Sequence, residues 1–508
     1  MSPIKAMKII WDVESKFDVA ALEYKDLKLW PIMRFPLYCE FNSNRVAVRP
    51  TTRPEKLKHF LERLSPRARI RILTEATIDR QHRASPSQSD VMYLTHSTSR
   101  TSKLEGGGFD AFFSPLMLHL RELGIQSFGQ ELAPRGQYIV PRFEPTQFIE
   151  RFSQKFEMLS RFGPKATIPE QTLNGLREIG EYVFENYGLR AKALEPRRVS
   201  KSVRRLEYWT KHFETVLDVV SPKLVMVVNY YSPPGHALTH AANRRGITTV
   251  DIQHGIQGDF HPAYSFLPND PDGPWSVVPK LFWTWSEQDA QNINRWGNYF
   301  HQGISGGNPL TEFSLTVGTH NEQTETLRRR INGSGRAHVV LVAYDGFYHE
   351  QWTEVVRDLI QQDVLSNVYW LIRVHPGRRY MTRSIKKLFD STYVDVTIST
   401  ESNLIDVLGL SDLVLAHSST LAIEAADFGL PVVLDSSTEP RFRQFNDSGH
   451  LNFAETSSAE ALSRNLREVL GAVSKESTDE AVLPSKPGEM GPALRHLLSI
   501  ANISTEEK

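Results

Sequence analysis

Short runs of apolar residues recur along the middle and end of the chain, separated by segments with the hydrophobic spacing of helices. A continuous apolar run of this length is typical of a strand buried on both faces of a parallel sheet. Strands that alternate with helices in this way predict an α/β protein with doubly wound sheets. We expect strands at 91–95, 224–228, 247–252 and 281–285, and again at 339–343, 369–374, 394–398, 413–416 and 432–434.

The two sets of strands predict two Rossmann-like domains. Residues 91–310 would form the first and residues 336–473 the second, because a polar stretch containing Asn-Gly-Ser-Gly separates them at 311–335. Residues 1–90 precede the first set of strands as an extension, which is partly basic. Residues 474–508 are expected to form a loop and a final helix.

Composition narrows the class of protein. Charge is balanced, with 59 basic and 59 acidic side chains among 508 residues, so no general preference for nucleic acid is indicated. The single cysteine, Cys39, fits a reducing compartment. No apolar run approaches the ~20 residues of a membrane helix, and no signal-peptide core is present at the N-terminus. We therefore expect a cytoplasmic protein.

Basic residues outnumber acidic ones between Arg45 and Arg83. A basic helical surface can contact anionic lipid headgroups, with about 1 kcal/mol from each well-placed charge. A solvated helix followed by a flexible loop explains the same composition. Peripheral contact with the inner face of the membrane is thus one of two interpretations of this segment.

Polar residues follow three of the strands expected in the second half. Because the carboxyl ends of parallel strands meet at one edge of a sheet, these residues should converge on one cleft, where ligands of such sheets bind. They are Asp345, then His375 with Pro376, and then the run of His417, Ser418, Ser419 and Thr420.

These residue types suit a departing phosphate. The imidazole of His375 can donate a hydrogen bond or a proton, and Arg373 and Arg378 can supply charge and paired donors. The turn at 418–420 precedes helically spaced residues, and the free N–H groups of a helix start attract phosphate. Each feature also has a structural interpretation, as a strand-end histidine or as a capped helix.

Two carboxylates near this edge have open roles. Glu424, one turn into the expected helix, could accept ribose hydroxyls or could be a surface carboxylate. Asp345 could act as a general base, or could simply form a turn beside Gly346.

The first half contributes candidates for the acceptor side. Gln253, His254 and Gly255 follow the strand expected at 247–252, with Asp259 and His261 a few residues later. His254, Asp259 and His261 are rival bases to Asp345, because a base is defined by its distance from the hydroxyl that it deprotonates.

Two further motifs are weak signals. Gly107 lies in a glycine run between a strand and a helix, where the backbone could approach a substrate closely or simply turn. Asp270 and Asp272 match the Asp-x-Asp pattern of metal-dependent sugar transferases. They stand in a Pro- and Gly-rich loop with no strand before it, so no metal is expected.

The combined motifs resemble a family. The residues are Gln253-His254-Gly255, Gly307-Asn308-Pro309, Tyr344-Asp345-Gly346, His375-Pro376 and Ser418-Ser419-Thr420. Together they look like GT-B glycosyltransferases of bacterial surface polysaccharide synthesis. Within these they are similar to the capsule and lipopolysaccharide group that includes sialyl- and Kdo transferases with CMP-activated sugars. Tyr344 stands where that group has an acidic residue.

The resemblance implies an inverting, metal-independent glycosyltransferase. It would move a sugar from a nucleotide sugar, as co-substrate and CMP-linked, to a glycan or lipid-linked acceptor, with no other cofactor. His375, Ser418 and Ser419 would stabilise the leaving phosphate, and Asp345 or an acid of the first domain would act as base. Three alternatives remain open: a UDP-sugar transferase or epimerase, a polyol-phosphate transferase with a CDP-linked donor, and a nucleotide-binding scaffold without activity.

Overall fold

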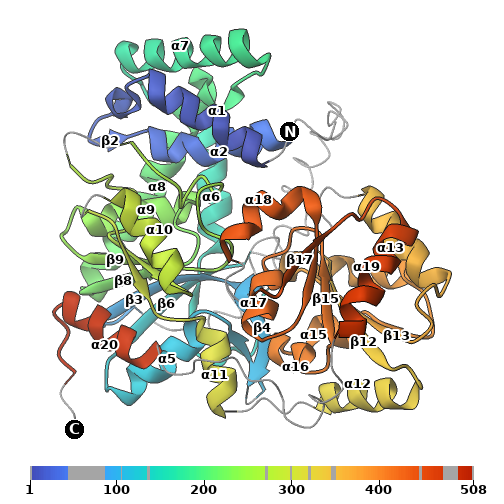
Figure 1. The fold of residues 1–508 in the computed structure, drawn as a ribbon. Helices are drawn as coiled ribbons and strands as arrows, with labels where there is room; N and C mark the ends of the chain where they lie inside the picture. Colours follow the sequence, from blue (N-terminus) through green and yellow to red (C-terminus); the bar gives the residue numbers. More distant parts are fainter. Residues whose placement is uncertain are drawn as a thin grey trace. The chain divides into compact units, whose positions relative to one another are not determined.

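The chain divides into two compact units in the computed structural model (Figure 1). Unit 1 contains Met1–Ser97, Gly106–Pro309 and Glu489–Lys508, and unit 2 contains Thr98–Glu105 and Leu310–Gly488. The structure describes residues 3–43, 86–104, 106–133, 138–268, 273–297, 300–317, 322–344, 350–445, 449–472 and 490–505.

Unit 1 is built around a parallel sheet of seven strands in the order β11-β10-β9-β8-β3-β6-β7. Counted along the chain within this sheet, the order is the Rossmann order with one further strand, and its direction of winding changes between β3 and β8. The strands are β3 (Val91–His96), β6 (Ser127–Leu132), β7 (Gln147–Phe148), β8 (Leu224–Val227), β9 (Thr248–Ile252), β10 (Leu281–Thr284) and β11 (Gln302–Ser305).

Helices cover both faces of this sheet, because its central strands are apolar on both sides. Met92 and Leu94 of β3 pack into one core cluster, whereas Val91 and Tyr93 pack into another. The second cluster includes the final helix of the chain, whose Leu494 joins the core of unit 1. The helices are α5 (Phe113–Glu122), α6 (Glu150–Phe162), α7 (Glu170–Tyr187), α8 (Pro196–Val220), α9 (Pro233–Asn243), α10 (Glu287–Gly297) and α20 (Met490–Ile500).

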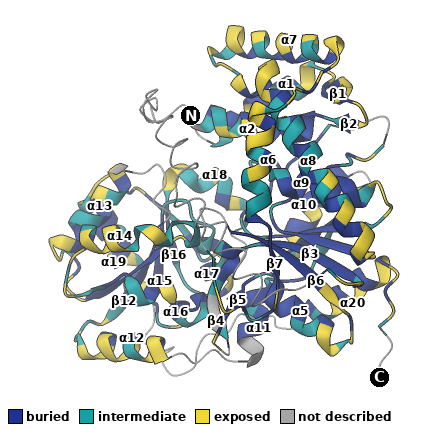
Figure 2. Ribbon diagram, turned by 180° about the vertical axis from the view of Figure 1, so that it is seen from behind, coloured by how far each residue is buried: buried dark blue, intermediate teal, exposed yellow. Residues whose placement is uncertain are grey.

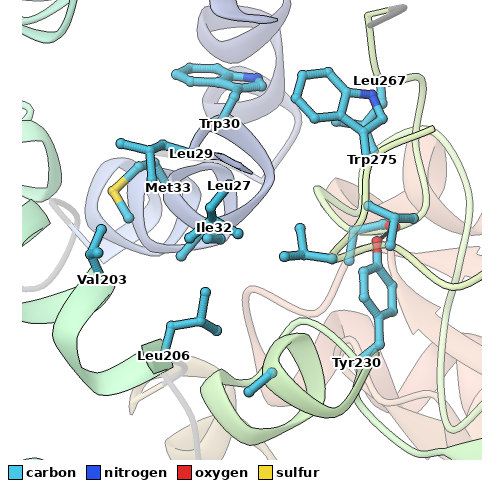
Figure 3. Packing of buried hydrophobic residues seen from close by; sticks show 14 of the residues in the cluster. Leu27, Leu29, Trp30, Ile32, Met33, Val203, Leu206, Tyr230, Leu267 and Trp275 are labelled. Carbon is cyan, nitrogen blue, oxygen red and sulfur yellow. Dashed lines mark hydrogen bonds between the residues drawn. The ribbon is translucent and has the colours of Figure 1, made fainter. Parts of the chain in front are cut away.

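The described part of residues 1–43 is helical and belongs to unit 1. It consists of α1 (Pro3–Lys16), the two-stranded β1 (Glu23–Tyr24) and β2 (Leu27–Lys28), and α2 (Trp30–Ser43). Figure 3 shows Trp30, Ile32 and Met33 of this segment in the hydrophobic cluster that also holds Val203 and Leu206 of α8.

Arg34 of α2 joins α1 through a buried ion pair and the loop that follows β9 through hydrogen bonds. Arg34 is 1% exposed, and its Nε donates to Glu14 Oε1 of α1 at 2.7 Å. The same guanidinium donates to the carbonyl oxygens of Pro262, Ser265 and Phe266. All three nitrogen atoms of the Arg34 guanidinium therefore donate hydrogen bonds that join α1, α2 and this loop.

Unit 2 contains a parallel sheet of six strands in the order β14-β13-β12-β15-β16-β17. Counted along the chain within the sheet, this is the Rossmann order 3-2-1-4-5-6. The strands are β12 (His338–Tyr344), β13 (Val368–Val374), β14 (Val394–Asp395), β15 (Leu413–Ala416), β16 (Val432–Asp435) and β17 (Leu451–Ala454). The short β4 (Arg100–Leu104) is also part of unit 2, and β5 (Gly107–Asp110) of unit 1.

The helices of unit 2 are mostly short. Residues 311–335, expected as a linker, contain two of them, α11 (Pro309–Val317) and α12 (Glu322–Gly333). Figure 2 shows the sheet strands as largely buried and the outer faces of α12 and α13 as exposed. The others are α13 (Glu350–Gln361), α14 (Thr382–Leu388), α15 (Thr397–Glu401), α16 (Leu404–Leu408), α17 (Leu421–Asp427), α18 (Glu439–Phe442) and α19 (Ala459–Ala472).

The predicted α/β fold class with two doubly wound sheets is confirmed: both units are Rossmann-like, with parallel sheets and covering helices. One predicted strand is mostly wrong. Only Val394 and Asp395 of 394–398 are extended, and α15 begins at Thr397. The reason is local, because Asp395 Oδ1 accepts the Ser399 N–H at 2.7 Å and so favours a helical turn.

Candidate functional site

The carboxyl edge of the unit 2 sheet is the candidate site. The winding direction changes between β12 and β15, which are neighbours with Ala343 opposite Ala416. In doubly wound sheets, ligands bind outside the carboxyl ends of the strands at this point. His375 follows β13, on the other side of β12, and its N–H donates to Tyr344 O at 2.9 Å.

His375 is exposed and has a defined orientation. It stands at the start of the 3-10 helix Pro376–Met381, and its Nδ1 accepts the Gly377 N–H at 3.1 Å. Because Nδ1 is an acceptor, the neutral ring carries its proton on Nε2. His375 can therefore present an N–H donor to an anion at this edge.

Two arginines near His375 are used within the fold. Arg373 is 6% exposed, and its Nη1 donates to the carbonyl oxygens of Ser399 and Ser402, the latter at 2.9 Å. Burial, with the charge of Arg379 nearby, lowers the pKa of Arg373 to about 9. Arg379 donates to the carbonyl oxygens of Arg100 at 3.2 Å and Thr101 at 2.9 Å. It thereby holds β4 within unit 2.

The remaining predicted nucleotide ligands are partly accessible. Pro376 and Arg378 are half-buried, and Arg378 Nη1 lies 3.7 Å from the sulfur of Met381. Glu424 on α17 is also half-buried. Its charge raises the pKa of Arg373, against the larger effect of burial, which indicates that the two groups are close.

The turn after β15 is half-buried throughout, from His417 to Thr420. Ser419 Oγ accepts the Leu421 N–H at 3.4 Å, and Thr420 precedes α17 without a side-chain cap. The His417 ring stands edge-on to Trp352, with 6.0 Å between centroids. Because α17 is only seven residues long, its N-terminus is not counted as a binding site by itself. The groups of this turn that could contact a ligand are its hydroxyl and imidazole side chains.

Three predicted features lie outside the described residues: Asp345, the Asp270–Asp272 pair and the basic segment 45–83. In the ranges that the structure does describe, no three His, Cys, Asp or Glu side chains come together in a way that could hold a metal ion. Over those same ranges, every helix is too short or too polar to cross a lipid bilayer.

In unit 1, Gln253 at the end of β9 is fully buried and joined to its neighbours. Its Oε1 accepts the Trp285 N–H at 2.6 Å, and its Nε2 donates to Gly255 O and to Asp289 Oδ2, each at 3.1 Å. Gln253 thus links the ends of β9 and β10 to α10.

His254 is half-buried among aromatic rings. Its Nε2 lies 3.2 Å from Tyr231 Oη, its Nδ1 lies 3.3 Å from Ile252 O, and its ring stacks on Tyr231. Burial lowers the pKa of His254 to about 4. The neutral imidazole is therefore the form present at neutral pH, suited to hydrogen bonding.

Asp259 and His261 do not share one environment. The Asp259 carboxylate is 57% exposed and lies 3.7 Å from Arg295 of α10. His261 Nδ1 accepts the Ala263 N–H at 3.2 Å, and its ring packs near Phe35 and Tyr264.

Gly107 has a packing role in β5. A Cβ there would lie 2.7 Å from the backbone nitrogen of Phe143, so the neighbouring chain requires glycine. This contact joins segments more than 30 residues apart in the sequence.

Two residues at the carboxyl edge of the unit 1 sheet were not predicted from the sequence. Tyr231, which contacts His254, follows β8, and His96 is the last residue of β3, so both flank the point where winding changes. Burial lowers the pKa of His96 to about 4, and its charge would lower that of His254 in turn. The signal available was their position, since His96 directly follows the strand predicted at 91–95 and Tyr231 lies in the loop after the strand predicted at 224–228.

No family model matches the sequence, and no curated protein matches it either. Among solved structures, the UDP-GlcNAc 2-epimerase from Methanocaldococcus jannaschii is 12% identical, with 81% of this chain and 99% of that chain covered and a TM-score of 0.47. The Neisseria meningitidis UDP-GlcNAc 2-epimerase bound to UDP-GlcNAc is 15% identical, with 80% and 98% covered and a TM-score of 0.46. The glycotransferase of kitacinnamycin is 11% identical, with 82% and 97% covered and a TM-score of 0.41.

These findings contradict the main functional prediction, an inverting transferase with a CMP-linked donor. UDP-GlcNAc 2-epimerases recur among the structures that resemble this chain. The alternative of an epimerase for UDP-linked sugars agrees better with them. The likeness to these structures concerns the fold alone. The side-chain contacts described above are those of this chain.

Proposed function

We propose that the protein is an enzyme that acts on a UDP-linked sugar, with epimerisation as its reaction. The observation that carries the proposal is the carboxyl edge of the unit 2 sheet. There, exposed His375 and the half-buried turn from His417 to Thr420 follow strands on the two sides of β12. Among the alternatives left open by the sequence, a UDP-linked sugar is chosen because UDP-GlcNAc 2-epimerases recur among the structures similar to this chain.

The side chains of this edge suit a diphosphate. His375 Nε2–H can donate to a phosphate oxygen, and the Gly377 N–H that holds Nδ1 keeps the ring in that orientation. The hydroxyls of Ser418 and Ser419 can donate to further oxygens. Such donors stabilise negative charge on the diphosphate when its bond to the anomeric carbon weakens.

Epimerisation at the carbon beside the anomeric carbon removes a proton from one face and returns one to the other. An enzyme that weakens the bond to the diphosphate at the same time needs the donors described above. This reaction leaves a direct trace, since the hydrogen that returns comes from solvent.

The test is incubation of the full chain with UDP-N-acetylglucosamine in deuterium oxide. We expect one deuterium at the sugar carbon beside the anomeric carbon, detected by mass spectrometry and proton NMR. Calorimetric titration should show UDP binding that His375→Ala weakens about tenfold or more, because a charge-assisted hydrogen bond contributes about 1.5–3 kcal/mol.

His338→Ala is the matched control. His338 begins β12, whereas His375 follows the end of β13, so the control removes the same ring from the opposite edge of the same sheet. UDP affinity should not change in His338→Ala. Equal affinity in both variants, or no UDP binding by the wild-type chain, would contradict the proposal. UDP binding without deuterium uptake would contradict the reaction alone.

A further inference from the structure

The end of α6 exposes three large apolar side chains within five residues. Met158 is 47% exposed, Leu159 36% and Phe162 63%. Positions 158 and 162 are one helical turn apart, so their side chains lie on the same face of α6. In the described ranges, no other five-residue stretch exposes even two large apolar side chains to this degree.

The other side of α6 is held in the core of unit 1. The Phe156 ring packs edge-on against Trp209, with 5.0 Å between centroids, and the Phe152 ring lies 4.5 Å from that of His212. Rotating α6 to bury Phe162 would break these contacts with α8. The apolar face at its end is therefore a fixed surface feature.

A tight turn follows this face. The Gly163 N–H donates to Leu159 O at 2.8 Å, and a Cβ on Gly163 would lie 2.5 Å from the same oxygen. Glycine is therefore required here, and Pro164 and Lys165 follow directly. The Ala166 N–H then donates to Ser200 Oγ of α8 at 2.9 Å, which fixes the end of the turn.

The charge around these apolar residues is positive. Arg161 and Lys165 are exposed, and residues 158–165 contain no acidic side chain. Arg161 lies over the Phe162 ring, 5.6 Å from its centroid. Exposed phenylalanine beside basic side chains is the composition that binds at the interface of an anionic bilayer, because apolar burial and attraction to headgroups add.

A second exposed phenylalanine provides a contrast. Phe184 of α7 is 57% exposed, but Glu181 and Glu185 flank it in the sequence. An anionic surface would repel these carboxylates, so exposure of an aromatic ring alone does not identify the partner. The charge of the neighbouring residues is what identifies the partner.

We propose that residues 158–165, the end of α6 and its turn, form a membrane-binding wedge. Phe162 and Met158 enter the headgroup region of an anionic bilayer, while Arg161 and Lys165 contact lipid phosphates. The wedge belongs to unit 1 and is built independently of the sheet edge proposed to bind UDP. It thus goes beyond the proposed function, and either proposal can fail alone.

The test is flotation of the full chain with vesicles of phosphatidylglycerol and phosphatidylethanolamine, and with vesicles of phosphatidylcholine. We expect binding to the anionic vesicles that weakens as salt rises. The double variant Met158→Ser, Phe162→Ser should reduce the partition coefficient about tenfold or more, since each side chain loses apolar burial. Arg161→Glu with Lys165→Glu should reduce it to a similar extent.

Phe184→Ser is the matched control, because it removes an equally exposed ring from acidic surroundings, and its vesicle binding should equal that of the wild type. Melting temperatures of all variants report whether they fold. If the serine variant fails to fold, the charge-reversal variant provides the same test. The proposal is overturned if the wild-type chain does not bind anionic vesicles, if it binds phosphatidylcholine equally well, or if neither wedge variant weakens binding.

Discussion

The two sheets have the same winding and use their carboxyl edges differently. In unit 1, Gln253 is fully buried and His254 is surrounded by rings, so both connect parts of the fold. In unit 2, His375 is exposed, and its Nδ1 accepts an N–H from the turn that orients the ring. Strand order predicts where a ligand would bind, whereas burial decides which polar residues can reach it.

The two units also differ in the charge of their buried ionisable groups. Unit 1 buries ionisable groups and shifts them towards neutrality: burial lowers the pKa of His236 and of His301 to about 4 and raises that of Asp251 to about 7. In unit 2, Arg373 keeps its positive charge at neutral pH although it is buried. We therefore expect the free energy of unfolding to depend more on buried ionisable groups in unit 1 than in unit 2.

The largest expected effect is on the buried ion pair of unit 1. Arg34→Met leaves the Glu14 carboxylate buried without its cation and frees three carbonyl oxygens, so the free energy of unfolding of unit 1 should fall by about 3–5 kcal/mol. Denaturant unfolding with hydrogen exchange resolved by unit measures it.

The control for this variant is Arg244→Met. Arg244 pairs with Asp26 at 3.2 Å, but the two side chains are 50% and 56% exposed, so the loss should stay below about 1 kcal/mol. UDP affinity should not change in either variant at temperatures where unit 1 is folded. Equal destabilisation by both changes would show that burial does not distinguish them.

A smaller effect comes with pH. His236 has a pKa of about 4 in the fold and about 6.5 when unfolded, so its contribution is complete above pH 6.5 and is lost as pH falls towards 4. The loss is about 3 kcal/mol at most. His236→Gln should reduce the difference in unfolding free energy between pH 7 and pH 4.5, measured by urea denaturation. An unchanged difference in His236→Gln would contradict the role assigned to the burial of this histidine.

The smallest effects compare one polar residue from each carboxyl edge. Gln253→Leu removes the acceptor of the Trp285 N–H and should cost about 1–3 kcal/mol. Ser419→Ala removes a long contact of 3.4 Å and should cost less than about 0.5 kcal/mol, while weakening UDP binding. Thermal unfolding and calorimetric titration measure the two quantities. If Ser419→Ala destabilised the fold more than Gln253→Leu, the carboxyl edge of the unit 2 sheet, and not that of unit 1, would be the one that stabilises the fold.

The apolar runs were sufficient to predict the central strands of both sheets, because strands buried on both faces have few polar residues to obscure them. Four strands nearer the sheet edges, β6, β7, β11 and β17, were not predicted, and β6 contains the polar residues Gln130 and Glu131. Elements with local polar caps were less predictable. Asp110 Oδ1 accepts the Phe112 and Phe113 N–H groups, so α5 begins at Phe113. The residues from Gly107 to Asp110 form β5, where the sequence indicated only a connection between a strand and a helix.

Candidate site residues could be located by strand ends but not sorted by role. Arg373 and Arg378 looked equivalent in the sequence, yet only Arg373 donates to the carbonyl oxygens of 399 and 402. Those partners lie more than 20 residues away, and no local pattern indicates them. The same holds for Arg34 and its partners beyond residue 260, which give the N-terminal helices their place in unit 1.

The chain enters each unit more than once. Residues 98–105 belong to unit 2 although the sequence on both sides belongs to unit 1, and residues 489–508 return to unit 1 after unit 2 is complete. Proteolysis at any one position therefore cannot release either half intact. A fragment starting at 310 would lack the strand held by Arg379, and a fragment ending at 309 would lack the helix that contributes Leu494. During synthesis, unit 1 gains α20 only after all segments of unit 2 have been made.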